Sequence, residues 1–138
     1  MSYESLSDGG FATGSMLGSG GFIVYDEDAS IPYGTYTYAR FYHHESCGQC
    51  SPCREGTGWL EKVLHRIIHG HGKMSDIDLL VDVAKKIEGN TICPLGDAAA
   101  WPIASAIRHF RAEFEWYIAN PDKVKRLING KYPAGRSL

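Results

Sequence analysis

The sequence predicts a mainly α-helical protein, a small four-helix bundle preceded by one short strand. Apolar residues recur at helical spacing in four segments after residue 30, and short stretches rich in Gly, Ser or Pro divide these segments. The chain has 138 residues, of which 43% are hydrophobic and 22% charged, so it can bury one core of its own. Helices joined by short loops are typical of a bundle.

The composition argues against a protein that binds polyanions or spans a membrane. The formal net charge is −2, and no block of Lys or Arg offers a surface for nucleic acid. No apolar run approaches the roughly 20 residues that a membrane-spanning helix needs. The polar start, MSYESLSDGG, is not a signal peptide. We therefore expect a soluble, non-secreted protein with no nucleic-acid partner and no direct membrane insertion.

The first 30 residues contain one expected strand after a glycine-rich stretch. Gly and Ser dominate residues 1–21, where we expect little regular structure. Residues 21–25 (GFIVY) form a short apolar run with β-branched and aromatic side chains, closed by acidic residues, as a buried strand would. Because a lone strand is not stable without partners, we expect it to pack on another subunit or on a preceding part of a larger chain.

The first two predicted helices flank three of the four cysteines. The first runs from about Thr35 to His44, and its apolar face comprises Tyr36, Ala39, Phe41 and Tyr42. The second begins near Pro52, with Ser51 as the expected cap, and ends at Gly70. Its apolar stripe comprises Trp59, Leu60, Val63, Leu64, Ile67 and Ile68.

The third and fourth predicted helices flank the last cysteine. Ser75 followed by Asp78 resembles a capping box, and Gly89 closes the third helix. Its stripe comprises Ile77, Leu80, Val81, Ala84 and Ile87. The fourth helix is predicted from about Trp101 to Ile118, because Pro is tolerated in a first turn. After it, the tail at 121–138 is expected to be extended or loosely packed.

Four cysteines form the most informative motif. Three lie in Cys47-Gly48-Gln49-Cys50-Ser51-Pro52-Cys53, and Cys93-Pro94 follows after 39 residues. Cysteines this close rarely pair with relaxed disulfide geometry, whereas two-residue gaps let three thiolates surround one metal centre. A remote cysteine followed by proline often completes a ferredoxin-type centre. The sequence therefore predicts one 4Fe-4S cluster with the ligands Cys47, Cys50, Cys53 and Cys93.

Zinc is the chemical alternative, as a structural module with four cysteine ligands that mediates assembly. Such sites usually consist of two separate Cys-x-x-Cys pairs, so the arrangement of three plus one favours the iron–sulfur cluster. His65 and His69 are spaced for one helix face but lack a third ligand, and we expect them at the surface. Arg54 is interpreted either as a compensating charge near the sulfurs or as a solvated residue.

Both cysteine segments resemble the NADH-oxidising flavoprotein (F-type) subunit of respiratory complex I. Residues 45–56 (ESCGQCSPCREG) are similar to its cluster motif, and residues 91–102 (TICPLGDAAAWP) to the segment that holds its fourth ligand. Pro94 departs from the small residue expected there. The cluster motif also occurs in diaphorase subunits of NAD-dependent hydrogenases and formate dehydrogenases, which remain an alternative. The segment after Cys93 favours the respiratory form.

The resemblance implies that the chain consists of three segments and holds the 4Fe-4S cluster but not FMN or NADH. Residues 1–30 would be the remnant of a ubiquitin-like β domain and a linker, residues 31–120 the helical 4Fe-4S-binding domain, and residues 121–138 a C-terminal tail. The family binds FMN and NADH in an N-terminal domain that does not precede residue 1 here. We therefore expect no FMN or NADH site in this chain, which would be either the C-terminal part of a flavoprotein subunit or the product of a split gene.

The resemblance also implies a function, the electron-transfer part of NADH:quinone oxidoreductase. FMN, in the missing domain or a partner chain, would be reduced by NADH, and the 4Fe-4S cluster would pass its electrons singly to the next iron–sulfur subunit. Expected partners are the other peripheral-arm subunits, especially the large iron–sulfur subunit and the small 2Fe-2S subunit. The expected location is the cytoplasmic side of the bacterial inner membrane or the mitochondrial matrix side. This chain alone is not expected to be catalytic.

Overall fold

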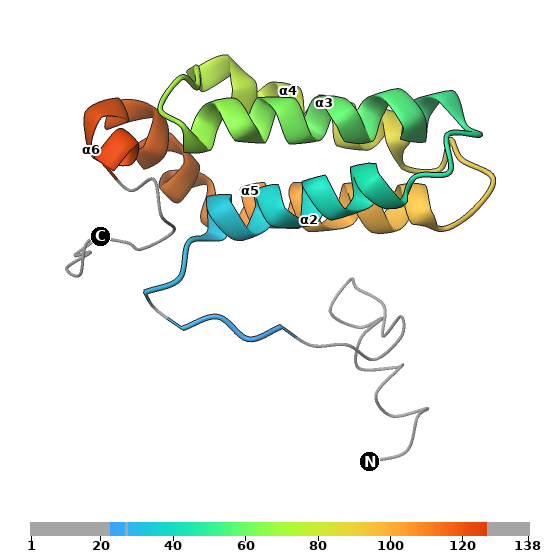
Figure 1. The fold of residues 1–138 in the computed structure, drawn as a ribbon, viewed down its shortest axis with the longest axis horizontal. Coiled ribbons are helices and arrows are strands. Elements are labelled where there is room, and N and C mark those ends of the chain that lie inside the picture. Colours follow the sequence, from blue (N-terminus) through green and yellow to red (C-terminus); the bar gives the residue numbers. More distant parts are fainter. Residues whose placement is uncertain (1–22, 27, 127–138) are drawn as a thin grey trace, which may run out of the picture.

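The protein folds as a bundle of four long helices with a short fifth helix at one end (Figure 1). A computed structural model describes residues 23–26 and 28–126, and its helices are α2 (Ile31–Glu45), α3 (Ser51–Ile68), α4 (Met74–Ile87), α5 (Leu95–Ala119) and α6 (Pro121–Arg126). Helix α2 packs on α3 and α5, and α4 packs on the same two helices from the other side. The predicted mainly α fold is confirmed, and the described residues contain a fifth helix, α6, beyond the four predicted.

Helix α2 begins at Ile31 and not at Thr35. The hydroxyl of Ser30 accepts the N–H of Tyr33 at 2.9 Å and so caps the helix, while Pro32 fits the first turn. Its buried face consists of the small residues Pro32, Gly34, Thr35 and Ala39. Phe41, which was predicted on the apolar face, is 56% exposed. Small side chains therefore let α2 lie close to its neighbours.

Helices α3 and α4 follow the predicted stripes, except that Trp59 is 57% exposed and so lies outside the buried face of α3, and they differ at their caps. The cap of α3 is Cys50, with no side-chain hydrogen bond, so Ser51 is its first helical residue. At the start of α4, the carboxylate of Asp76 accepts the N–H of Lys73 at 2.8 Å. The predicted capping box of Ser75 and Asp78 is therefore wrong, because the cap is Lys73, two residues before Ser75, and the helix begins at Met74.

The C-terminal third contains more helix than the sequence indicated. Helix α5 begins at Leu95, where the carbonyl of Pro94 accepts the N–H of Ala98 at 2.9 Å, so Pro102 lies inside the helix. Phe110 departs from helical geometry (φ −129°, ψ 27°). The predicted extended tail is wrong for 121–126, because α6 forms there with Val124 only 1% exposed. Residues 127–138 lie outside the described part.

The predicted strand is not confirmed. Residues 23–26 have no regular secondary structure, and Gly21 and Phe22 lie outside the described residues, as does the rest of the glycine-rich stretch. The hydroxyl of Tyr25 lies 2.6 Å from the hydroxyl of Tyr38, which attaches this segment to α2. The expectation of a preceding ubiquitin-like domain stays untested by these residues.

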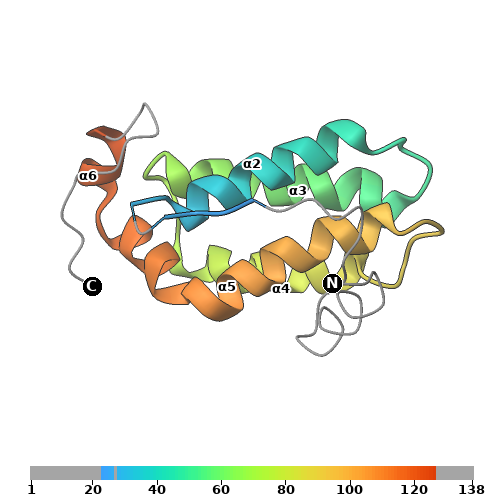
Figure 2. The same cartoon turned by 90° about the horizontal axis from the view of Figure 1, so that it is seen from below.

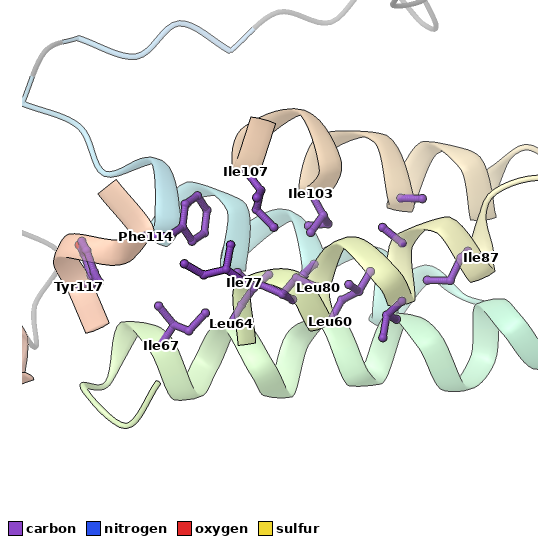
Figure 3. Close-up of a cluster of buried hydrophobic side chains, with 14 of the residues drawn as sticks. Leu60, Leu64, Ile67, Ile77, Leu80, Ile87, Ile103, Ile107, Phe114 and Tyr117 are labelled. Carbon is purple, nitrogen blue, oxygen red and sulfur yellow. The ribbon is translucent and has the colours of Figure 1, made fainter. Parts of the chain in front are cut away.

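A continuous apolar core runs along the bundle (Figure 3). It extends from Tyr117 at one end to Ile87 at the other, and its fully buried side chains include Leu60, Leu64, Ile67, Ile77, Leu80, Ile103 and Phe114. Each such side chain contributes roughly 1.5–3 kcal/mol by leaving water. None of the described helices has the length and hydropathy needed to cross a membrane. The core makes the helices a firm support for the loops at their ends.

Candidate metal centre

Two loops that are distant in sequence lie at the same end of the bundle (Figures 1 and 2). One joins α2 to α3, and the other joins α4 to α5. Cys47 and Cys50 lie on the first loop, Cys53 in the first turn of α3, and Cys93 on the second loop. The N–H of Ile92 lies 3.5 Å from the sulfur of Cys50 and donates to it. The fold therefore brings the remote cysteine's loop against the three-cysteine loop.

Close packing of α3 on α4 holds the two loops together at this end. Gly56, one turn after Cys53, is buried against Ile87, the last residue of α4. A Cβ at position 56 would lie 2.6 Å from Cγ1 of Ile87, which is closer than real Cβ atoms approach. The absence of a side chain at Gly56 thus brings the ends of the two helices together beside the cysteines.

The three-cysteine loop is held by Arg54 and turned by Gly48. Gly48 has φ +79°, a left-handed conformation that glycine adopts without strain. The guanidinium of Arg54 donates to the carbonyl of Gly48 at 2.7 Å and to the hydroxyl of Ser51 at 3.3 Å. Its side chain is 48% exposed, so Arg54 is partly solvated while it braces the loop.

Ser46 connects the end of α2 to the buried cysteine. Its backbone N–H donates to the carbonyl of Tyr42 at 3.1 Å, and its hydroxyl accepts the N–H of Gly48 at 3.4 Å. The same hydroxyl lies 3.2 Å from the sulfur of Cys53. The hydroxyl of Thr57 donates to the carbonyl of Cys53 at 2.7 Å. Cys53 is therefore fixed through both its sulfur and its backbone.

The loop that carries Cys93 is fastened to the first turns of α5. The carboxylate of Asp97 accepts the N–H of Gly89 at 2.7 Å, and Glu88 accepts the indole N–H of Trp101 at 2.6 Å. The hydroxyl of Thr91 donates to the carbonyl of Cys93 at 3.0 Å. Sequence reasoning missed these contacts, although an acidic residue three positions after Pro94 is a signal for the start of a helix.

The four cysteines differ in their exposure to water. Cys53 is 7% exposed and Cys50 is half-buried, whereas Cys47 and Cys93 are exposed, and all four are free thiols. Within residues 23–26 and 28–126, no group of three or more His, Cys, Asp or Glu side chains gathers closely enough to hold a metal ion. The structure thus brings the two cysteine loops together without closing the thiols around one centre, and their role as ligands stays a prediction.

The histidines and tryptophans add no ligand to this end. The rings of His65 and His69 stack, with centroids 3.9 Å apart, on the outer part of α3. Trp59 is 57% exposed, while Trp101 is 39% exposed and bonded to the second loop through Glu88. The thiols are therefore the chemically relevant donors at this end of the bundle, and four thiols on two adjacent loops suit an iron–sulfur cluster.

Comparison with known proteins connects this end of the bundle to a family. Residues 35–117 match the model of the NADH-ubiquinone oxidoreductase-F iron-sulfur binding region, and this range includes all four cysteines. The chain is 55% identical to the F subunit of NADH-quinone oxidoreductase from Rickettsia bellii (strain OSU 85-389) over 115 residues, which are 83% of this chain. The corresponding protein of Rickettsia conorii is 55% identical over 124 residues, or 90% of this chain.

The likeness covers one part of longer proteins. The chain spans 27% of the length of the Rickettsia bellii protein and 28% of that of the Rickettsia conorii protein. The matched family model, in contrast, covers more than half of this chain. It includes the four long helices except for the first residues of α2 and the last two residues of α5. The chain therefore belongs to the family of iron–sulfur binding regions of the F-type subunits of NADH-ubiquinone oxidoreductase.

Proposed function

We propose that this chain is the electron-transfer part of an NADH-quinone oxidoreductase, in which Cys47, Cys50, Cys53 and Cys93 hold a 4Fe-4S cluster. The observation that carries the proposal is the hydrogen bond from the N–H of Ile92 to the sulfur of Cys50. It ties the loop of Cys93 to the other cysteines, and N–H donors to sulfur are a recurring feature of iron–sulfur sites.

The residues around the cysteines fit the requirements of such a group. A 4Fe-4S cluster supplies one-electron transfer, here between FMN reduced by NADH and the next iron–sulfur subunit. The backbone N–H groups at the start of α3 and the positive end of its dipole favour the negative charge of bound thiolates. Arg54 and Gly48 brace the loop that carries Cys47 and Cys50.

The partners and location follow from the same assignment. FMN and NADH would be bound in a domain preceding this part or in a partner chain. The neighbours would be other peripheral-arm subunits, notably the large iron–sulfur subunit and the small 2Fe-2S subunit, on the cytoplasmic or matrix side of the membrane. The matched relatives are named as NADH-quinone oxidoreductase subunits, which favours this assignment over a hydrogenase or formate dehydrogenase diaphorase.

Replacing the remote cysteine tests the ligand set. The full chain is reconstituted anaerobically with iron and sulfide, and the cluster is followed by absorption and by electron paramagnetic resonance after reduction. Cys93→Ser is expected to lose the 4Fe-4S signal, while the helical circular dichroism is largely retained because the core does not include Cys93. Cys47→Ser and Cys50→Ser should behave in the same way.

A variant at the opposite end of the bundle provides the control. Met74 is 51% exposed at the start of α4, so Met74→Ser should keep the wild-type cluster signal. If Cys93→Ser had the same iron content and spectrum as Met74→Ser, Cys93 would not be a ligand of the cluster. A wild-type chain that takes up one zinc and no iron would instead support the structural zinc module.

A further inference from the structure

We propose that the hydroxyl of Ser46 donates a hydrogen bond to the Cys53 thiolate and thereby raises the reduction potential of the cluster. The proposal rests on the proposed function, because it concerns a sulfur assigned there as a ligand. Ser46 belongs to no predicted ligand set, and the sequence motif alone assigns it no task. Its position is fixed by the fold, at the C-terminal cap of α2.

The hydrogen bonds of Ser46 give the direction of this contact. A hydroxyl has one proton to donate and lone pairs to accept with. The Ser46 oxygen accepts the N–H of Gly48 at 3.4 Å, and the polar atom within reach of its own proton is the Cys53 sulfur at 3.2 Å. A thiolate that binds metal has no proton and can only accept. When the Cys53 sulfur is a metal-bound thiolate, this hydrogen bond can therefore only run from the Ser46 hydroxyl to the sulfur.

Burial makes this contact more influential than others at the site. Cys53 is 7% exposed, so few waters can hydrogen-bond its sulfur, whereas Cys47 and Cys93 are exposed to solvent. Hydrogen bonds in such low-dielectric surroundings are electrostatically stronger than those in water. Ser46 is therefore a side-chain donor to the most buried of the four sulfurs.

The anchoring of Ser46 keeps the donor in place. Its N–H is bonded to the carbonyl of Tyr42 at 3.1 Å, and Gly48 is held by the guanidinium of Arg54 at 2.7 Å. The hydroxyl is thus fixed from the helix end and from the loop. A hydrogen bond to a cluster sulfur stabilises the more negative, reduced state, so it raises the potential.

The test is a redox titration of the reconstituted full chain, followed by electron paramagnetic resonance. In Ser46→Ala, the ratio of oxidised to reduced cluster at a fixed potential should rise about tenfold, which is a decrease of about 59 mV for one electron. Ser46→Thr keeps the hydroxyl and should titrate like the wild type. The matched control is Ser105→Ala, which removes an exposed hydroxyl that donates to the carbonyl of Pro102 within α5, and it should leave the potential unchanged.

Each outcome decides the proposal. A Ser46→Ala protein with full iron content and the wild-type potential overturns it, and so does an equal shift in Ser105→Ala. If Ser46→Ala and Ser46→Gly both fail to hold a cluster while Ser46→Thr succeeds, the hydroxyl serves to retain the cluster, and a tuning role is overturned. A wild-type chain with no iron–sulfur cluster would be a failure of the proposed function itself, which is visible before any variant is titrated.

Discussion

Gly56 and Ile87 meet where α3 and α4 converge beside the cysteine loops, and a Cβ at position 56 would lie 2.6 Å from Cγ1 of Ile87 and 2.7 Å from its Cδ1. Ile87 is 1% exposed and belongs to the main core, so it has little space into which to move. The contact links the packing of the bundle to the distance between the two loops. A substitution at this contact should therefore change both the stability of the protein and the spacing of the two cysteine loops.

Gly56→Ala is expected to destabilise the protein by about 1–3 kcal/mol, because overpacking a filled core outweighs the better helix propensity of alanine. The measurement is denaturant unfolding followed by circular dichroism. Ile87→Ala removes both clashing atoms, so the double variant should lose less stability than the sum of the two single losses. Additive losses would show that the two residues do not meet.

Asp76→Asn tests the buried ion pair at the start of α4. The Asp76 side chain is 3% exposed, accepts from Nε of Arg66 at 3.0 Å and from the N–H of Lys73 at 2.8 Å, and also contacts Nη2 of Arg66. Loss of the charge should cost about 2 kcal/mol of unfolding free energy, since charge-assisted bonds at a buried group are replaced.

Asp82 offers the matched control on the same helix. It pairs with Lys86 four residues later, and the two side chains are 53% and 72% exposed. Asp82→Asn should change the stability by no more than about 0.5 kcal/mol, because water screens the pair. Equal effects of Asp76→Asn and Asp82→Asn in the same unfolding assay would contradict the role assigned to the buried carboxylate.

Much of this fold is predictable because the apolar stripes of α3 and α4 are long and in phase. The predicted starts of α4 and α5 were misplaced for one reason. Residues such as Ser, Asp and Pro can either cap a helix or lie within its first turns, and the sequence alone does not say which. Pro102 indicated a helix start, yet the turn preceding it is already helical from Leu95. Asp76 caps α4 while Ser75 does not. Such choices depend on tertiary contacts, such as that between Asp76 and Arg66.

The sequence indicated the cysteines of the candidate site, but it did not indicate the hydrogen bonds that hold them in place. Close spacing indicated Cys47, Cys50 and Cys53, whereas Cys93 was indicated by the proline that follows it and by the family resemblance. The contacts of Ser46 with Cys53 and of Ile92 with Cys50 require the loops to be placed first. Ile92 and Cys50 are 42 positions apart, so no local pattern indicates their meeting.

The charge state of His65 should depend on pH in a characteristic way. Burial, followed by the neighbouring His69, lowers the pKa of His65 below its ordinary value of about 6.5, while Glu61 raises it. The folded state therefore prefers neutral His65, so its stabilising contribution is complete above that ordinary value and falls as pH decreases toward the folded pKa.

Titration of the imidazole resonances by nuclear magnetic resonance checks this expectation. The midpoint of His65 should lie below about 6.5, and His69→Gln should move it upward because a nearby positive charge is removed. Glu61→Gln should move it downward, since the attraction of that carboxylate is lost. A His65 midpoint at or above the ordinary value, unchanged in His69→Gln, would contradict the assignment.

Metal analysis of the full chain, purified without oxygen, tests the central claim most directly. If Cys47, Cys50, Cys53 and Cys93 hold a 4Fe-4S cluster, iron and acid-labile sulfide should each approach about four per chain, in a brown protein with an electron paramagnetic resonance signal on reduction. About one zinc per chain, in a colourless protein that takes up no iron and sulfide on reconstitution, would contradict the claim.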